Sequence, residues 1–127
     1  MNNQNDILEW ISKAEEDYQL SRISLQRKQP LTYGATFHAQ QCAEKYIKAV
    51  LISKQIAFPR THDLAALFSL CQQNGIYLPI SEDNLEMLSA FAIEVRYPGV
   101  QPTREEAKEA LVIAKGVRRF TRKFLGL

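Results

Sequence analysis

The sequence predicts an all-α fold, an antiparallel up-and-down four/five-helix bundle. Apolar residues recur with helical spacing along almost the whole chain, and no run alternates strictly between apolar and polar residues as a half-buried strand does. Turn signals divide the chain into four long segments and a short one. The loops between them, about four to eight residues long, favour antiparallel neighbours and are too short to cross a bundle.

The first two predicted helices are long. The first runs from about Asp6 to Lys28, before Pro30, which cannot continue a helix. Its inward stripe, with spacings of three and four residues, consists of Ile7, Ile11, Ala14, Tyr18, Ser21 and Leu25. The second helix runs from about Tyr33 to Gln55 and is the most apolar of the set.

Capping signals delimit the other three helices. The third begins near Thr61–Asp63 and ends at Asn74-Gly75, with core residues Leu64, Leu67, Phe68 and Cys71. The fourth has Ser81 as its N-cap and ends at Tyr97-Pro98-Gly99, with core residues Leu85, Leu88, Ala92 and Val95. The fifth opens with a capping box formed by Thr103 and Glu106 and runs to Phe124.

Composition indicates one globular domain over residues 1–127. Of the 127 residues, 46% are hydrophobic and 24% charged, and a domain of this size buries roughly two-thirds of its unfolded surface. The start, MNNQND, has neither the basic nor the apolar region of a signal peptide, and the apolar runs are too short to span a membrane. The two cysteines lack C-x-x-C spacing, so we expect reduced thiols and a cytoplasmic location.

The second helix has an unusual distribution of polar residues. At about 100° per residue, Ala39, Ala43, Tyr46 and Val50 centre its core stripe, and a narrow polar arc holds His38, Gln41, Lys45 and Lys48. Gln40 and Glu44 fall instead on an apolar flank, where a carboxylate needs a partner. Two interpretations stay open. Glu44 pairs with Lys48 at the rim of the bundle, or Gln40 and Glu44 meet groups from elsewhere in a polar pocket or a dimer seam.

Three segments together resemble the HEPN domain family. They are Phe37-His38-x-Gln40-Gln41-x-x-Glu44-Lys45-x-x-Lys48-Ala49, Arg60-Thr61-His62-Asp63-Leu64 and Glu94-x-Arg96-Tyr97-Pro98, and the resemblance spans Trp10 to about Ala114. It implies a five-helix up-and-down bundle that usually dimerises. It also implies a genomic partnership with a minimal nucleotidyltransferase, a nucleotide-binding role, and frequent membership of toxin–antitoxin systems.

Many catalytic members of that family are metal-independent ribonucleases with an Arg-x4-6-His motif. Here Arg96 is followed by Tyr97-Pro98-Gly99-Val100-Gln101-Pro102, and neither His38 nor His62 has an Arg at the matching distance upstream. The missing motif favours a non-catalytic module that binds a nucleotide or a partner nucleotidyltransferase. A ribonuclease that uses atypical residues, such as Arg96 with His62 or His38, stays open as the alternative.

The candidate ligand or partner site combines the polar residues of the second helix with the segments that flank the third and fourth helices. It comprises His38, Gln40, Gln41, Glu44, Lys45, Lys48, His62, Arg96 and Tyr97. The Arg fork would suit a phosphate and the Tyr ring a base. A structural ion pair between Glu44 and Arg96, with His62 as part of the first turn of the third helix, explains the same residues without a ligand.

Neither a metal nor a cofactor is expected. His38 and Cys42 have the spacing of two ligands on one helical face, but His62 and Cys71 are too far apart to complete a compact zinc module, so the cysteines are predicted to be small core residues. The chain has no Gly-rich phosphate loop and no H-E-x-x-H motif. Acyl-transfer and P-loop chemistry therefore have no support.

Positive charge is concentrated at the C-terminus. The net charge is only +2, yet residues 103–127 contain seven Lys/Arg and three Glu. Lys115, Arg118, Arg119 and Arg122 share one side of the last helix. They either form a solvated helix end that complements the helix dipole or contact RNA phosphates or an acidic partner, and an RNA-binding accessory is thus a third hypothesis.

Assembly is predicted from the second helix. Apolar or small residues cover about two-thirds of its circumference, which is more than a surface helix of a monomeric bundle needs. A homodimer is therefore expected, with a nucleotidyltransferase as its protein partner, a nucleotide or RNA as further ligands, and no membrane association.

Overall fold

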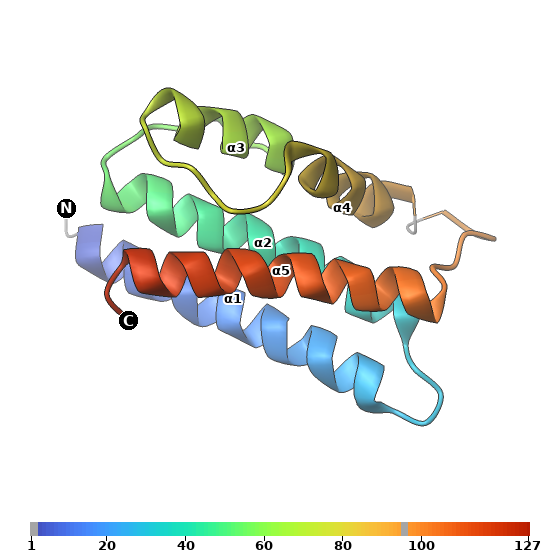
Figure 1. Ribbon diagram of the computed structural model, residues 1–127. Coiled ribbons are helices and arrows are strands. Elements are labelled where there is room, and N and C mark those ends of the chain that lie inside the picture. Colours follow the sequence, from blue (N-terminus) through green and yellow to red (C-terminus); the bar gives the residue numbers. More distant parts are fainter. Residues whose placement is uncertain (1–2, 95–96) are drawn as a thin grey trace.

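The computed structural model describes residues 3–94 and 97–127, and this part of the chain is helical without any strand. Its five helices are α1 (Asn3–Gln26), α2 (Thr32–Ser53), α3 (Leu64–Gln73), α4 (Glu82–Glu94) and α5 (Arg104–Phe124). Figure 1 shows α1, α2 and α5 lying along one another, with α3 and α4 in a row over α2. The predicted all-α bundle is confirmed.

The central element of the bundle is α2, which packs against each of the other four helices. The broad apolar surface of α2, from which a homodimer was predicted, is therefore used within one chain, and that argument for a dimer was wrong. Small side chains allow the neighbouring helices to approach α2 closely. Ala35, Ala39, Cys42 and Ala49 are fully buried against these helices. Larger residues fill the space between the helices, and Tyr46, Ile47 and Leu51 are also fully buried. Each such side chain contributes roughly 1.5–3 kcal/mol by leaving water.

Three helices begin at the predicted N-caps. The Asp63 carboxylate accepts hydrogen bonds from the amides of Ala65 and Ala66, and Thr103 and Glu106 form the predicted capping box. Asn84 N–H donates to Ser81 Oγ over 3.1 Å, so Ser81 caps α4 as expected. The end of α2 differs slightly. It stops at Ser53 because Gln55 takes a left-handed conformation with φ of 57°.

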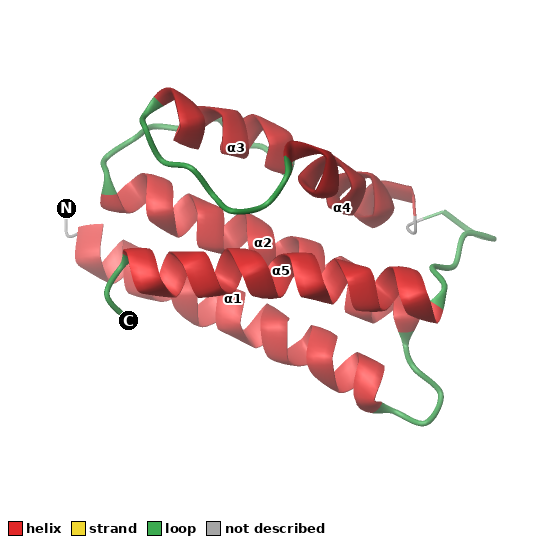
Figure 2. Cartoon of the chain, in the orientation of Figure 1, coloured by secondary structure: helices red, strands yellow, loops and turns green. Residues whose placement is uncertain are grey.

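The connection between α2 and α3 positions the candidate site. As Figure 2 shows, a loop leaves the end of α2 and runs back along this helix before α3 begins. His62, at the end of this loop, contacts Gln40 and Glu44 in the middle of α2. The start of α3 is therefore held against the centre of the bundle.

The end of α4 is described only in part. Its predicted core residues Leu85 and Leu88 are fully buried. The Ala92 side chain and all of Val95 lie outside the described residues.

In the described part of the chain, no helix combines the length and the apolar character that a membrane span requires.

Candidate functional site

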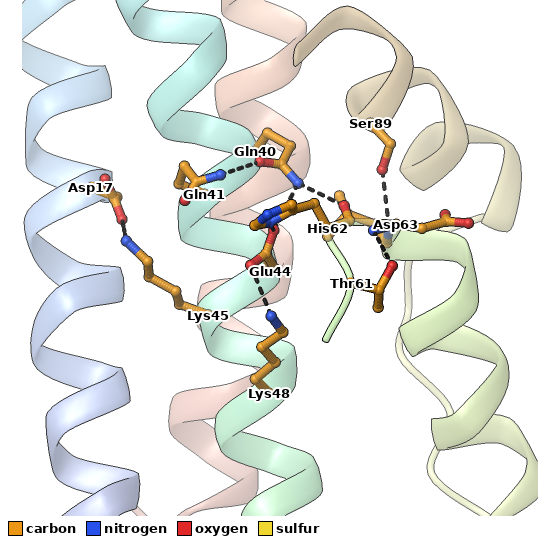
Figure 3. Close-up of polar contacts among 11 residues, drawn as sticks. Asp17, Gln40, Gln41, Glu44, Lys45, Lys48, Thr61, His62, Asp63 and Ser89 are labelled. Atoms are coloured by element: carbon orange, nitrogen blue, oxygen red, sulfur yellow. Dashed lines mark hydrogen bonds and ion pairs between the residues drawn. The ribbon is translucent and has the colours of Figure 1, made fainter. Parts of the chain in front are cut away.

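Glu44 is the centre of a buried polar network on α2 (Figure 3). Only 2% of the residue is exposed, and its carboxylate accepts three hydrogen bonds. Gln40 Nε2 donates to Oε1 over 3.2 Å, Lys48 Nζ donates to Oε2 over 3.0 Å, and His62 Nδ1 lies 2.9 Å from Oε1. The network joins two turns of α2 to the segment that precedes α3.

Both interpretations of Glu44 describe part of this arrangement. The expected pair with Lys48 is present, but it is buried instead of lying at the rim, since the two side chains are 7% and 3% exposed. Gln40 and Glu44 also meet groups from elsewhere, because Gln40 Nε2 donates to the His62 carbonyl oxygen over 3.0 Å. Within one chain, Gln40 and Glu44 therefore belong to a polar network with Lys48 and with the segment that precedes α3.

Aromatic rings complete the surroundings of Lys48. Its Nζ lies 5.5 Å from the centre of the Trp10 ring and 5.6 Å from that of Phe58. A buried ammonium group is costly unless it is paired, and the rings add cation–π attraction to the ion pair with Glu44. Trp10 on α1 and Phe58 in the loop after α2 thus stabilise the buried lysine of α2.

His62 links this network to the surface. Its side chain is 70% exposed even though its partner Glu44 is buried. The carboxylate accepts hydrogen bonds, so Nδ1 of the ring donates, and Nε2 forms no hydrogen bond with another described residue. His62 lines a groove of about 500 Å³ between the start of α3 and α4, together with Asp63, Ala65, Glu86, Ser89, Ala90 and Ile93.

The start of α3 is fully occupied by contacts within the chain. Leu64 N–H donates to the buried Ser89 Oγ over 3.1 Å, and Asp63 accepts from the two following amides. These amides are therefore not free to hold a phosphate as an uncapped helix N-terminus would.

Part of the polar arc on α2 contacts α1. His38 Nδ1 lies 2.8 Å from Asp17 Oδ1, and Lys45 Nζ pairs with the other oxygen of the same carboxylate. Gln41 Nε2 donates to Gln40 Oε1 over 2.8 Å. Sequence reasoning missed Asp17, although its position three residues after Ala14 and four before Ser21 places it on the inward stripe of the first helix.

Glu15 is a second missed acidic residue, and it fixes one of the C-terminal cations. Arg118 donates to it from Nε over 2.7 Å and from Nη2 over 2.8 Å, and Tyr46 OH donates to it over 2.6 Å. The hydrogen bond from Arg118 lowers the pKa of Glu15 from 4.5 to about 2. Arg118 also lies 4.5 Å from the centre of the Tyr18 ring.

The other predicted cations line a surface hollow. Lys115, Arg119 and Arg122, together with Arg118, Lys123 and Leu127, surround a space of about 340 Å³ along the C-terminal half of α5. Phe120 and Phe124 lie on another side, as expected, with stacked rings 5.6 Å apart. The charged side of the helix is thus a concave surface.

Among the described residues, the structure does not bring Tyr97 into the network around Glu44. Tyr97 is 65% exposed, and Arg96 lies outside the described residues, as does any pair between Arg96 and Glu44. Both cysteines are buried free thiols, and burial raises the pKa of Cys71 to about 11. In residues 3–94 and 97–127, no three His, Cys, Asp or Glu side chains gather as a metal site would require.

Comparison with known proteins places these features in a family. A model of the HEPN domain matches residues 7–124. A protein of Methanocaldococcus jannaschii named "Putative toxin MJ1304" is 30% identical, and the alignment covers 91% of this chain and 86% of that protein. The crystal structure of ST0689, an archaeal HEPN homologue, has the same fold, with a TM-score of 0.68 at 23% identity over 92% of this chain and 95% of that one.

Proposed function

The chain belongs to the HEPN domain family, and from that premise we propose that it is a non-catalytic module whose groove between α3 and α4 binds a partner protein. The family resemblance implies a minimal nucleotidyltransferase as this partner, in a toxin–antitoxin-like pair. The observation that carries the proposal is the lining of the groove, which combines an apolar surface with acidic and imidazole groups.

The groove suits a polypeptide better than a nucleotide. Its described lining includes the carboxylates of Asp63 and Glu86 but neither lysine nor arginine, so a nucleotide phosphate would meet charges of its own sign. Ala65, Ala90 and Ile93 supply an apolar surface, and Ile93 is 54% exposed. A segment with an apolar residue beside a lysine or arginine complements both features.

The missing catalytic motif supports a non-catalytic role. Cleavage of RNA needs a group that takes the 2′-hydroxyl proton and a cation that stabilises the charge of the phosphorane. His38 and His62 each contact a carboxylate, Asp17 and Glu44 respectively. The sequence also lacks the Arg-x4-6-His motif. Lys45 and Lys48 pair with these two carboxylates, so the missing motif, and not the charge around the rings, supports the non-catalytic role.

A homodimer is part of the proposal. Exposed apolar side chains occur where α1 leads into α2, namely Leu20, Ile23, Leu31 and Tyr33, which are 39–56% exposed. Leu31 N–H donates to the Ser24 carbonyl oxygen over 3.0 Å, so these residues belong to neighbouring helix ends, and apolar side chains exposed together are typical of a surface that a second protein covers. A twofold dimer would bury the same patch on both copies.

Reconstitution with the minimal nucleotidyltransferase of the same genome tests the partner proposal. The two proteins are expressed together, and the complex is measured by light scattering and by isothermal titration calorimetry. Ile93→Glu adds a third carboxylate to the apolar lining, and we expect it to weaken binding at least about tenfold, or ~1.4 kcal/mol. Val112→Glu is the matched control, because Val112 is 67% exposed on α5 and does not line the groove.

Two results would contradict the proposal. One is a complex whose affinity is the same in Ile93→Glu and Val112→Glu. The other is calorimetric binding of ATP or GTP to the chain alone that Ile93→Glu abolishes, which would identify the groove as a nucleotide site.

A further inference from the structure

Independently of the groove, we propose that the hollow on the C-terminal half of α5 binds the phosphodiester backbone of a nucleic acid without reading its bases. Five cationic side chains line this hollow, namely Lys115, Arg118, Arg119, Arg122 and Lys123. Leu127 is the one apolar residue in the lining. The class of ligand follows from the charge, the order and the spacing of these groups.

The hollow carries a large uncompensated positive charge. Within the described residues, Glu15 is the one carboxylate that pairs with any of the five cations, and its partner is Arg118. Lys115, Arg119 and Lys123 are exposed and form no ion pair with another described residue. At physiological ionic strength the Debye length is about 8 Å, so neighbouring cations in one hollow act together on an anion.

Arg118 is held in place before any ligand binds. Glu15 occupies its Nε and Nη2 donors, and the Tyr18 ring covers the guanidinium at 4.5 Å. The Nη1 donors of the fork are not used by Glu15 and can reach a phosphate oxygen. Arg22 on α1 lies 5.8 Å from the centre of the same Tyr18 ring but does not line the hollow.

The spacing of the exposed cations matches a repeating anion. Lys115, Arg119 and Lys123 follow one another at intervals of four residues. At about 1.5 Å of rise per residue, successive charges are about 6 Å apart along α5. A row of phosphates along one strand can therefore meet one cation after another.

The composition of the lining favours a nucleic acid over an acidic protein as the ligand. Protein interfaces have apolar or aromatic centres from which charged residues are depleted, whereas five of the six lining residues here are charged. The lining also lacks an aromatic side chain on which a base could stack. Contacts with phosphates alone give affinity without sequence preference.

Fluorescence anisotropy with a labelled single strand tests this proposal, using RNA and DNA of the same sequence. We expect a Kd of about 10⁻⁴ to 10⁻⁶ M for both, with log Kd rising with log salt concentration. The double variant Arg119→Gln/Lys123→Gln should raise Kd about tenfold and reduce the salt slope by about 1.4, which is two phosphate contacts at about 0.7 each. The strand that binds more tightly identifies the natural source of the backbone.

A matched control removes two charges at the other end of the same helix. Arg104→Gln/Lys108→Gln changes the net charge equally, but neither residue lines the hollow, so Kd should stay within about twofold. Circular dichroism melting checks that both variants fold. Ile93→Glu should leave nucleic-acid binding unchanged, which separates this test from that of the partner groove.

Three results would overturn the proposal. They are the absence of binding to either strand at low salt, an equal loss of binding in the two double variants, and displacement of the strand by polyglutamate as efficiently as by unlabelled RNA. The last result would assign the hollow to an acidic polypeptide.

Discussion

Glu44 accepts a hydrogen bond from His62, so that a residue buried in the middle of α2 holds the segment before α3 against this helix. The Nδ1–Oε1 distance is 2.9 Å, and the same oxygen accepts from Gln40. Because Glu44 is buried and His62 exposed, this contact links the core to the groove between α3 and α4. A change at this carboxylate therefore affects both the core of the bundle and a residue that lines the groove.

The first prediction concerns the charge of Glu44. Glu44→Gln keeps the size of the side chain but leaves the buried ammonium group of Lys48 without a counter-ion. Breaking a buried pair by removing one partner costs about 3–5 kcal/mol. We therefore expect a large fall in Tm, measured by circular dichroism.

Glu109→Gln is the matched control, because Glu109 is exposed on α5. A change within about 0.5 kcal/mol is expected for a surface position of this kind. Equal Tm values for the two variants would show that the Glu44 charge does not stabilise the fold.

The second prediction concerns acid stability and rests on Glu15. Because Arg118 lowers the pKa of Glu15 from 4.5 to about 2, the folded state binds a proton less readily than the unfolded state. The resulting stabilisation is fully present above pH 4.5 and is lost as the pH falls toward 2. After solvent screening we expect about 1 kcal/mol.

Denaturant unfolding between neutral and acid pH measures this contribution. In Glu15→Gln, which cannot titrate, the decrease of the free energy of unfolding with acid should be smaller. The same dependence on pH in Glu15→Gln and in the unchanged chain would assign acid lability to other carboxylates.

Helical periodicity was enough to predict the five helices and most of the residues that face the core. It placed Gln40 and Glu44 on an apolar flank, and the structure buries both. Periodicity assigns a face to each residue but does not identify the neighbouring helix. The partners of the polar arc, Asp17 above all, therefore could not be found from α2 alone.

The position of His62 depends on the path of the loop after α2, and local sequence patterns do not predict this path. The loop that follows α2 runs back along it, and only this path brings His62 to Glu44. Similarly, Arg118 was predicted on the charged side of the last helix, but its pairing with Glu15 joins residues 103 positions apart. The expected pair between Glu44 and Arg96 stays a prediction, since Arg96 lies outside the described residues.

The third prediction is the absence of ribonuclease activity. Purified protein should cleave neither single-stranded RNA nor tRNA above the buffer rate in the absence of metal, because neither histidine has the Arg of the catalytic motif at the required spacing. Gel electrophoresis of labelled RNA provides the measurement. Cleavage that His62→Ala abolishes would show instead that the exposed imidazole acts as a general base.

The fourth prediction concerns assembly, and it tests the apolar patch where α1 leads into α2. Light scattering at micromolar concentration should give the mass of a dimer. Ile23→Glu should shift the mass to that of a monomer, because Ile23 is 56% exposed and a carboxylate there would be buried in the interface without a partner. Val112→Glu adds the same charge at a residue that is 67% exposed on α5 and should remain dimeric. A monomer mass for the unchanged chain would exclude the homodimer, and a dimer that persists in Ile23→Glu would place the interface elsewhere.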